Sequence, residues 1–256
     1  MAASNATLHH LDRGRRGRCS KADRPMTPAS FKIGFLLFPG MTQLDLTGPY
    51  EVLSRLPGAE IHLVWKDTAP VASDRGLAIV PTATFATCPT LDLICVPGGP
   101  GINDLLTDAP VLDFVRYQAW GARYVTSVCT GALVLGAAGL LHGVKATTHW
   151  MSHGLLAEFG AIPVRARVVS DGRIITGGGV TAGIDFGLTL LAEIGGRALA
   201  EAVELGLEYD PQPPFGTGTP DRASPELVAR LQTLSAQIQG LRREQVRRAA
   251  AALAPA

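Results

Sequence analysis

The chain has 256 residues, of which 46% are hydrophobic and 18% are charged, and its formal net charge is +1. A chain of this length and composition can bury a sizeable core, which suits one globular α/β domain with appendages and excludes an intrinsically disordered protein. The balanced charge gives no reason to expect nucleic acid or an acidic membrane surface as a partner.

The sequence also shows no secretory signal and no membrane span. No window of about 20 apolar residues is present, and the N-terminus lacks the apolar run and small-residue cleavage site of an exported protein. We therefore expect a cytoplasmic protein whose cysteines are free thiols. None of the four cysteines forms a C-x-x-C pair, which argues against a structural zinc site and a thioredoxin-type site.

Residues 1–28 differ from the rest of the chain. They are rich in arginine and have almost no apolar periodicity, so we expect a disordered basic tail. A true start of the protein at Met26 is one explanation for this tail. A basic targeting arm or nucleic-acid-binding arm is the less favoured interpretation.

Residues 29–208 alternate between apolar runs and amphipathic segments. Short continuous apolar runs are typical of strands buried on both faces. The strands we expect are 31–38, 61–65, 77–80, 91–96 and 124–128, and a hairpin of 161–169 with 173–176. The helices we expect are 48–56, 109–120, 131–141 and 183–194. This alternation predicts a doubly wound, mostly parallel α/β sheet flanked by helices, with ligand sites at the carboxyl ends of its strands.

Residues 209–256 form a third segment. Residues 209–220 are rich in proline and glycine and predict an irregular linker, and residues 225–253 predict one long amphipathic helix. We expect its apolar face to pack on the body or on a second subunit; the members of that face are Leu227, Leu231, Leu234, Ile238 and Leu241. The other face is charged and carries Arg242, Arg243, Arg247 and Arg248. A membrane or nucleic-acid contact is less favoured, because arginines near a helix C-terminus also suit the helix dipole.

The most informative stretch is 124–139, in which an apolar run leads directly into Cys129 and then into a helix of small residues. A residue at such a strand-to-helix junction lies on a strained turn that directs its side chain into the site, and Ser127 and Gly131 are small enough to allow this. The N-terminus of the following helix favours the thiolate. The N–H of Thr130 is placed to stabilise negative charge on a substrate. We predict that Cys129 is a nucleophile at a nucleophile elbow.

Five stretches of the sequence resemble the ThiJ/PfpI superfamily, which has the class I glutamine amidotransferase-like, flavodoxin-like fold. They are FLLFPGMTQLDLTGPYEVL, ICVPGGPG, YVTSVCTGALVLGAAGLL, ATTHW and TGGGVTAGIDF. The resemblance covers about residues 31–208, and within the superfamily these stretches are most similar to bacterial isonitrile hydratases. The resemblance implies a homodimeric cysteine enzyme that needs no cofactor and hydrates a small isonitrile substrate to an N-substituted formamide.

Asp45 is the carboxyl group that the resemblance places against the cysteine, and it follows the first expected strand. A carboxyl group beside a thiolate should hold its proton more tightly, so we expect Asp45 to act as a general acid. The alternative is that Asp45 caps the helix that follows. Many hydrolytic relatives carry a histidine directly after the cysteine, where this chain has Thr130. That difference weakens a protease or amidase interpretation.

The remaining candidates are glycine loops and one histidine. Gly98 and Gly99 are expected to offer a backbone N–H to the substrate. Gly178 and Gly179 are expected to line the pocket and not to bind phosphate, since no Lys-Ser or Lys-Thr follows them. His149 is the residue for a Cys–His hydrolase alternative, because cysteine and histidine need only meet in space.

Other residues of reactive types are expected to be structural. Cys88 and Cys95 lack the context of Cys129 and are predicted to be inert. Asp185 is predicted to be a charge in the first turn of a helix. His149 and His153 are four residues apart, but no further ligand is evident, so no metal is expected.

For the reaction, we expect the Cys129 thiolate to attack the isonitrile carbon while Asp45 protonates it, giving a covalent thioimidate that water then hydrolyses. One alternative is another cysteine enzyme of the superfamily, a deglycase, glyoxalase or amidase that uses Cys129 and His149. Another is a non-enzymatic redox sensor in which Cys129 is oxidised. A regulator of the AraC type is disfavoured, because only about 48 residues follow Glu208 and a helix-turn-helix domain needs roughly 100.

Overall fold

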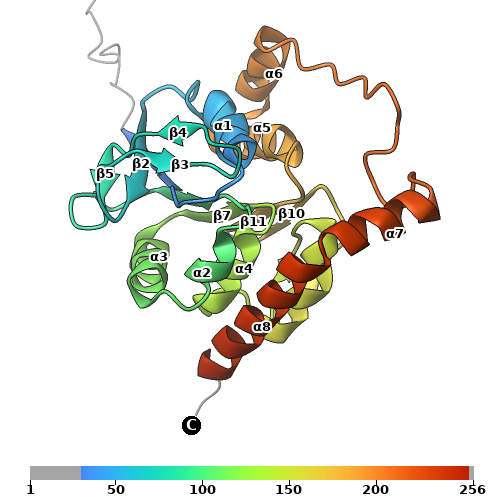
Figure 1. Cartoon of the computed structure of the whole chain (residues 1–256). Coiled ribbons are helices and arrows are strands. Elements are labelled where there is room, and N and C mark those ends of the chain that lie inside the picture. The colour runs from blue at the N-terminus through green and yellow to red at the C-terminus, as the bar shows by residue number, and fades with distance from the viewer. Residues whose placement is uncertain (1–29, 254–256) are drawn as a thin grey trace, which may run out of the picture.

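The computed structural model describes residues 30–253 (Figure 1), so the predicted tail of residues 1–28 lies outside the described residues. Within them, the central sheet has seven strands in the order β10-β11-β7-β6-β1-β2-β5. The strands are β1 (Phe31–Leu36), β2 (Ala59–Trp65), β5 (Ala83–Thr84), β6 (Leu93–Val96), β7 (Tyr124–Val128), β10 (Val168–Asp171) and β11 (Ile174–Gly177). All neighbouring strands are parallel except β10 and β11. The mostly parallel sheet predicted from the sequence is confirmed, and its strand order is flavodoxin-like.

The apolar runs of the sequence become strands that are covered on both faces. Every residue of β6 and β11 is buried, and β1 is buried at all positions except Lys32. Side chains from both faces of β1, including Phe35 on one face and Leu36 on the other, belong to the same hydrophobic core. Such two-sided burial is the usual environment of parallel strands in α/β proteins.

Two predicted strands lie outside the central sheet. Residues 77–80 contribute β4 (Ala78–Ile79), which pairs with β3 (Val71–Ala72) in a separate two-stranded sheet. The predicted strand 161–169 is divided: β9 (Ile162–Pro163) pairs with β8 (Lys145–Ala146), and only its last two residues enter β10. The contact with β8 ends at Val164, whose N–H donates to the Ala146 carbonyl at 2.8 Å, and β10 begins at Val168.

Helices cover both faces of the sheet. In Figure 1, α1 and α5 lie on one side of the sheet and α3 and α4 on the other. The helices of the body are α1 (Gln43–Leu53), α2 (Ile102–Leu105), α3 (Ala109–Gly121), α4 (Gly131–Ala137), the 3₁₀ helix η1 (Trp150–Phe159), α5 (Ala182–Gly195) and α6 (Arg197–Gly206). The doubly wound arrangement is therefore confirmed. However, α1 begins earlier than predicted, so that Asp45 lies in its first turn.

Four segments that are distant in the sequence meet at the carboxyl edge of the sheet. The strands β11, β7, β6 and β1 are consecutive neighbours. Their carboxyl ends lead into Gly178, Cys129, Gly98 and the start of α1 with Asp45, respectively. Because parallel strands end at the same edge, the fold brings these four positions together.

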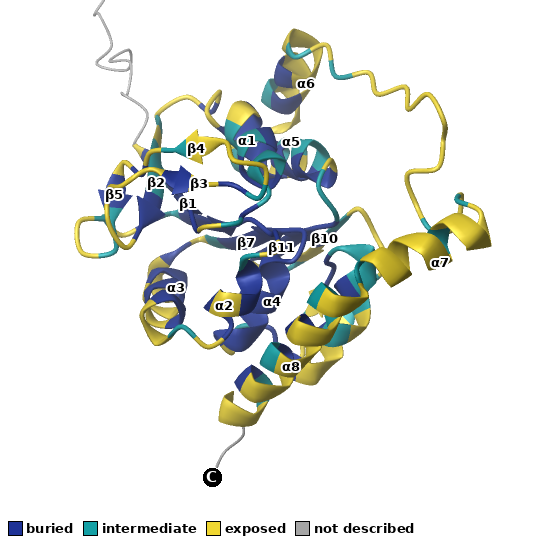
Figure 2. Ribbon diagram, in the orientation of Figure 1, coloured by how far each residue is buried: buried dark blue, intermediate teal, exposed yellow. Residues whose placement is uncertain are grey.

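The C-terminal segment contains two helices, not the single helix predicted. The first, α7 (Pro225–Leu234), ends at Ser235, and α8 (Ala236–Leu253) follows directly. No residue of α7 is buried, and Figure 2 shows this helix exposed along its length. In contrast, α8 packs against α2, α4 and η1. The linker that precedes α7 has no helix or strand, as predicted.

The face of α8 that packs on the body also differs from the prediction. The predicted apolar face stays largely in solvent: Leu227, Leu231, Leu234 and Leu241 are exposed. The buried residues are instead Arg242, Val246 and Ala249, which are spaced so that they share one helix face. The short side chains of Val246 and Ala249 let α8 approach closely, and Arg242, predicted on the charged face, is accommodated by the hydrogen bonds described below.

Candidate active site

Cys129 lies at the junction of β7 and α4 with a φ of 56°, and in residues 30–253 only Glu208 among the other non-glycine residues has a positive φ. This left-handed conformation costs a non-glycine residue about 1–2 kcal/mol, so other contacts must hold it. The Cys129 N–H donates to the carbonyls of Gly177 and Gly178 at 3.0 and 2.9 Å. The Thr148 hydroxyl donates to the Cys129 carbonyl at 2.7 Å. Cys129 therefore occupies a strained strand-to-helix turn.

This turn depends on the absence of a side chain at Gly131. A Cβ at that position would lie 2.0 Å from the carbonyl oxygen of Val96 and 2.7 Å from that of Pro97. Both oxygens are backbone atoms at the end of β6. They cannot move aside without displacing the sheet.

We therefore expect Gly131→Ala to lower the free energy of unfolding by about 3 kcal/mol, because the methyl group overpacks a site bounded by backbone. The midpoint of urea unfolding should fall while its slope stays constant. Gly154→Ala is the matched control, since nothing lies within 4 Å of a Cβ there. An unchanged midpoint for Gly131→Ala would show that β6 can yield to the added group.

The sulfur of Cys129 is shielded from water, with 5% of the residue exposed. Burial raises the pKa of the thiol, and the charge of Asp45 raises it further. The backbone N–H groups of Thr130 and Val180 donate to the sulfur and act in the opposite direction. The Thr130 N–H at the start of α4 favours the thiolate, in the direction expected from the sequence. Burial has the larger effect, so the pKa of the thiol is raised overall.

The carboxyl group of Asp45 is fully buried and interacts with the Cys129 thiol. Its Oδ2 accepts the Gly98 N–H at 3.1 Å, and its Oδ1 accepts no hydrogen bond from a nitrogen or oxygen of the described residues. Thr42 is the N-cap residue of α1. Asp45 therefore does not cap this helix, and its side chain faces the cysteine instead.

The Asp45–Cys129 pair controls where one proton lies. Burial raises the pKa of Asp45 to about 7, while the Cys129 thiol and the Gly98 N–H lower it. Above this pH the pair holds a single proton. Transfer of that proton from sulfur to Asp45 gives a thiolate beside a neutral carboxylic acid. The pair can thus provide a nucleophile and an acid in one contact.

The two glycines after β6 connect the side chains on either side of Cys129. The Gly99 N–H donates to Thr130 Oγ1 at 3.0 Å, and the Gly98 N–H donates to Asp45. Both N–H groups, which the sequence assigned to the substrate, are therefore engaged by Thr130 and Asp45. A Cβ at Gly98 would lie 2.8 Å from the Cys129 Cβ, so glycine is needed for this close approach.

The loop after β11 reaches the sulfur from the other side. The Gly178 N–H donates to the Arg167 carbonyl at 2.8 Å, and the Gly178 carbonyl accepts the Cys129 N–H. A Cβ at Gly179 would lie 2.7 Å from Cδ2 of His149. Gly178 thus contacts both Cys129 and Arg167, and Gly179 lies beside His149. The contact of these glycines with substrate stays a prediction.

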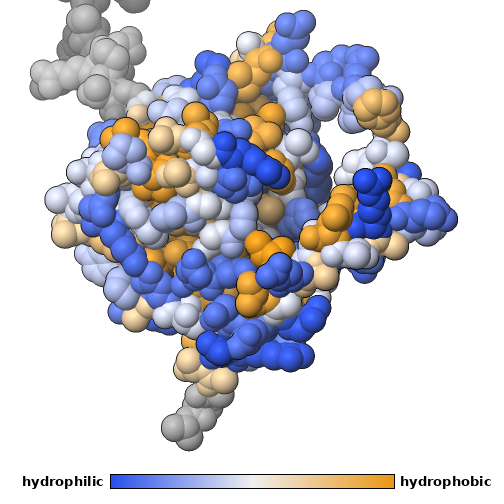
Figure 3. Space-filling view, in the orientation of Figure 1, coloured by the Kyte–Doolittle hydropathy of each residue, from blue (hydrophilic) through white to orange (hydrophobic). Residues whose placement is uncertain are grey.

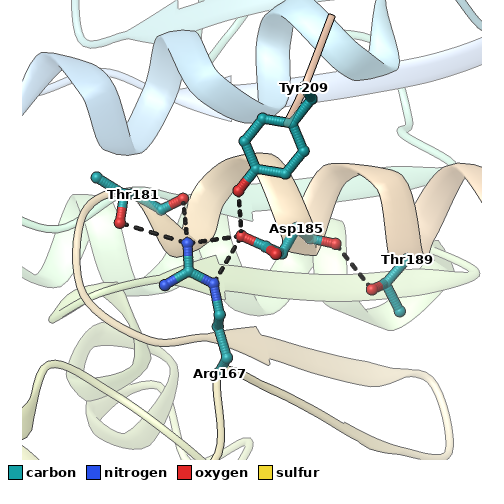
Figure 4. A network of polar contacts seen from close by, with 5 residues as sticks. All are labelled: Arg167, Thr181, Asp185, Thr189 and Tyr209. Atoms are coloured by element: carbon teal, nitrogen blue, oxygen red, sulfur yellow. Dashed lines mark hydrogen bonds and ion pairs between the residues drawn. The ribbon is translucent and has the colours of Figure 1, made fainter. Parts of the chain in front are cut away.

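A polar network fixes the end of this loop (Figure 4). Arg167 donates to Oδ2 of Asp185 at 2.6 Å and to the Thr181 carbonyl at 3.0 Å. The Tyr209 hydroxyl donates to the same Asp185 oxygen at 2.8 Å. Asp185 lies in the first turn of α5, as predicted. The network ties the start of α5 to the loop whose Val180 N–H contacts the sulfur.

His149 takes part in the structure of η1. Its Nδ1 accepts the Met151 N–H at 3.4 Å, so the imidazole proton lies on Nε2. Burial and the charge of Arg242 lower the pKa of His149 to about 4. Within residues 30–253, no hydrogen bond joins His149 to Cys129. The Cys–His pair that the hydrolase alternative needs is not formed.

Comparison with known proteins shows the family. Residues 31–193 match the DJ-1/PfpI family. The chain belongs to the DJ-1/PfpI family. It is 58% identical over 224 residues to a curated isonitrile hydratase from Pseudomonas putida, covering 88% of this chain and 98% of that protein. A ThiJ/PfpI family protein of known structure from Pseudomonas syringae shares 44% identity and superposes with a TM-score of 0.83, covering 89% of this chain and 98% of the other.

DJ-1/PfpI relatives differ in how much of this chain they cover. The HTH-type transcriptional regulator GbdR from Pseudomonas aeruginosa is 34% identical over 186 residues, covering 70% of this chain and 50% of the regulator. The alignment with the isonitrile hydratase is longer than residues 1–208 of this chain. It therefore includes part of the segment that follows Glu208.

Sequence reasoning missed three contributors to this DJ-1/PfpI site: the N–H of Val180, the hydroxyl of Thr148, and Arg242 on α8. Burial raises the pKa of Cys88 to about 11 and that of Cys95 to about 12, as expected for thiols that stay protonated. Among residues 30–253 no group of three or more potential metal-binding side chains is found. None of the helices in this range has both the length and the apolar character of a membrane span.

Proposed function

We propose that this protein hydrates isonitriles to N-substituted formamides, with Cys129 as nucleophile and Asp45 as general acid. The observation that carries the proposal is the buried contact between the Cys129 thiol and a carboxyl group whose pKa is raised to about 7. An isonitrile carbon must gain both a nucleophile and a proton, and this contact offers both. The identity of 58% to the Pseudomonas putida isonitrile hydratase supports the same reaction.

The first step forms a covalent intermediate. The shared proton lies on Asp45, and Cys129 is a thiolate that the N–H groups of Thr130 and Val180 stabilise. The lone pair of the isonitrile carbon takes the proton from Asp45. The sulfur bonds to the same carbon, and one pair of π electrons moves to nitrogen. The product is a thioimidate, S–CH=N–R, and Asp45 becomes a carboxylate.

The second step is hydrolysis of the thioimidate. Water bonds to the carbon, with the Asp45 carboxylate taking one proton of the water and returning it to the nitrogen. The resulting S–CH(OH)–NH–R collapses when its C–S bond breaks and its C=O bond forms. The hydroxyl proton returns to the Asp45–Cys129 pair. One isonitrile and one water give one formamide without oxidation or reduction, and the Asp45–Cys129 pair supplies every proton transfer that the proposed reaction needs.

The glycines around Cys129 are proposed to form the wall of the pocket at the reacting carbon. Gly98 and Gly99 support Asp45 and Thr130 through their N–H groups. Gly178 and Gly179 approach from the other side, where a side chain at Gly179 would crowd His149. In this arrangement Thr130 acts through its N–H on sulfur, and its hydroxyl holds Gly99.

The proposal is tested by incubating the purified protein with an aryl isonitrile and measuring the formamide by liquid chromatography and mass spectrometry. We expect formamide in proportion to enzyme concentration. Cys88→Ala is the matched control, because it removes a half-buried thiol outside the site and should keep full turnover. Formamide at only the rate without enzyme, from protein whose Cys129 is still alkylated by iodoacetamide, would refute isonitrile hydration.

The alternatives lack a supporting contact. A deglycase, glyoxalase or amidase that pairs Cys129 with His149 would need the two side chains to meet, and they do not exchange a hydrogen bond. A redox sensor would use the same Cys129 thiolate, and the identity of 58% to a curated isonitrile hydratase favours catalysis over sensing.

We also propose that a second copy of the chain covers α7, so that the enzyme is a homodimer. Figure 3 shows apolar side chains among hydrophilic ones on the surface of the C-terminal helices; the large exposed ones on α7 are Leu227, Leu231 and Leu234. A helix of 10 residues without buried side chains is marginal in water on its own. A symmetric partner would supply the missing apolar contact. The reduced thiol that the reaction requires supports the cytoplasm as its location.

Sedimentation equilibrium tests the dimer. We expect the wild-type protein to sediment as a dimer. In Leu231→Asp the dissociation constant of the dimer should rise at least about tenfold, because a charge is placed in the apolar contact. Gln232→Asp, an exposed neighbour, should remain dimeric. A wild-type protein that is monomeric at every concentration would refute this partner.

A further inference from the structure

Arg242 connects the C-terminal helix to the active site. It is one of the three buried residues of α8 and is 5% exposed. Its guanidinium donates in three directions: from Nε to Oδ1 of Asn103 at 3.0 Å, from Nη1 to Oγ of Ser152 at 3.1 Å, and from Nη2 to the carbonyl of Gly99 at 3.3 Å. These partners belong to α2, η1 and the loop after β6. Arg242 therefore joins three elements that surround the site.

All three partners of Arg242 are neutral. None of the ion pairs formed among residues 30–253 includes it. A buried cation without an anion costs several kcal/mol unless other interactions compensate for it. The three hydrogen bonds offset part of this cost. The Asp45–Cys129 pair carries one negative charge when it holds a single proton, and the charge of the Cys129 thiolate attracts that of Arg242.

The hydrogen bonds of Gly99 lead from Arg242 to the nucleophile. The Gly99 carbonyl accepts from Arg242, and the Gly99 N–H donates to Thr130 Oγ1 at 3.0 Å. The neighbouring Gly98 N–H donates to Asp45. The Thr130 hydroxyl also reaches this carbonyl, at 3.4 Å. Because the backbone on either side of a glycine Cα rotates easily, a donor that holds the Gly99 carbonyl limits the movement of the loop that carries the Gly98 and Gly99 N–H groups.

We propose that Arg242 is a positioning residue for the active site, which clamps the Gly98–Gly99 loop and supplies the positive charge that faces the Cys129 thiolate. This role deepens the proposed isonitrile hydration and rests on it. It also gives the C-terminal segment a function, because the helix that follows the linker contributes a side chain to the catalytic centre. The alignment with the isonitrile hydratase, which extends past Glu208, agrees with a role for this segment.

The titratable groups around the Cys129 thiol include acids, a second thiol and a neutral histidine. Asp45 on α1 is the acidic group in contact with the sulfur, and Asp74 acts on Asp45. Cys95 on β6 stays protonated because burial raises its pKa to about 12. His149 is neutral at physiological pH, in part because the charge of Arg242 lowers its pKa. Of these groups, Arg242 alone is a cation during the reaction.

Three variants test the role of Arg242. Arg242→Met removes the charge and the hydrogen bonds, Arg242→Lys keeps the charge but loses the planar fork, and Arg247→Met is a control at an exposed position on α8. The rate of Cys129 alkylation by iodoacetamide is measured against pH, with the modified peptide located by mass spectrometry. Steady-state hydration of an aryl isonitrile gives kcat and KM. Circular dichroism melting reports whether each variant is folded.

We expect Arg242→Met to shift the alkylation profile of Cys129 to higher pH and to lower kcat on the order of 10²-fold, with little change in KM, because a misplaced loop slows the chemical step. Arg242→Lys should keep an alkylation profile near that of the wild type and still lose kcat. Arg247→Met should match the wild type in both measurements. If Arg242→Met does not fold, Arg242→Lys carries the test through its loss of kcat.

Three results would contradict parts of this proposal. Wild-type kcat and an unshifted alkylation profile in Arg242→Met, with only a lower melting temperature, would reduce Arg242 to a structural contact and overturn the proposal. Wild-type kcat in Arg242→Lys would overturn the clamp. A wild-type protein that does not hydrate isonitriles, with an alkylation profile that still shifts in Arg242→Met, would refute the reaction while supporting the role of Arg242 at the thiol.

Discussion

Cys129→Ala is expected to abolish isonitrile hydration, with kcat/KM falling by at least about 10⁴-fold. Without sulfur no thioimidate forms, and Asp45 faces a methyl group that accepts no proton. The measurement is the initial rate of formamide formation at isonitrile concentrations below KM, with Cys88→Ala as the control that keeps Cys129. A Cys129→Ala protein that still produces formamide at a rate near that of the wild type would exclude covalent catalysis.

Cys129→Gly separates the strain at this position from its chemistry. The positive φ of 56° costs a cysteine about 1–2 kcal/mol, and glycine adopts it freely. We therefore expect this variant to be as inactive as Cys129→Ala and more stable than Cys129→Ala in urea unfolding. Equal stabilities of the two variants would show that the turn at Cys129 is relaxed.

Asp45→Asn is expected to lower kcat by about 10²–10⁴-fold, the usual contribution of a positioned general acid. Asparagine keeps the size of the side chain and an oxygen for the Gly98 N–H, but it cannot release a proton to the isonitrile carbon. The wild-type kcat/KM should rise as the pH increases through about 7, where the Asp45–Cys129 pair loses its second proton. That rise should disappear in Asp45→Asn. A wild-type kcat/KM that stays constant over about two pH units on either side of 7 would contradict this assignment.

The same substitution should change how stability depends on pH. The pKa of Asp45 is raised from 3.8 to about 7 by burial, so between these values the folded protein binds a proton that the unfolded chain has lost. The stability that this proton provides is present at low pH and is lost as the pH rises through about 7. We expect Asp45→Asn to gain stability relative to the wild type over this range, by up to about 4 kcal/mol. A difference in melting temperature that stays constant with pH would contradict the raised pKa.

Much of the fold follows from local patterns in the sequence. The apolar runs at β1, β6 and β7 predict buried parallel strands, and the strand–Cys–helix pattern predicts the turn at Cys129. The start of α1 is harder to predict, because Gly48 and Pro49 disfavour a helix when considered locally. In the structure, Pro49 lies close to Gly183 of α5, where a Cβ would be 3.0 Å from its Cδ. Tertiary packing therefore stabilises a helix that local propensity does not indicate.

The contribution of the C-terminal segment could not be read from its periodicity. An apolar stripe predicts which face of a helix is buried, but α8 buries Arg242 with Val246 and Ala249 and leaves Leu241 exposed. A buried arginine is stable there because Asn103, Ser152 and Gly99 accept its hydrogen bonds. These acceptors come from segments that only the folded chain brings together. The overall direction of the Cys129 pKa shift could not be predicted for the same reason, since the burial that raises this pKa depends on tertiary packing.

The most direct test of covalent hydration is mass spectrometry of the intact protein, quenched in acid during turnover of an aryl isonitrile. The proposed mechanism predicts an added mass equal to one isonitrile, located by peptide mapping on Cys129, that disappears once the substrate is consumed and formamide has accumulated. Formamide production with Cys129 unmodified at every quench time, and with undiminished turnover after that cysteine is alkylated, would show that water attacks the isonitrile without a bond to sulfur.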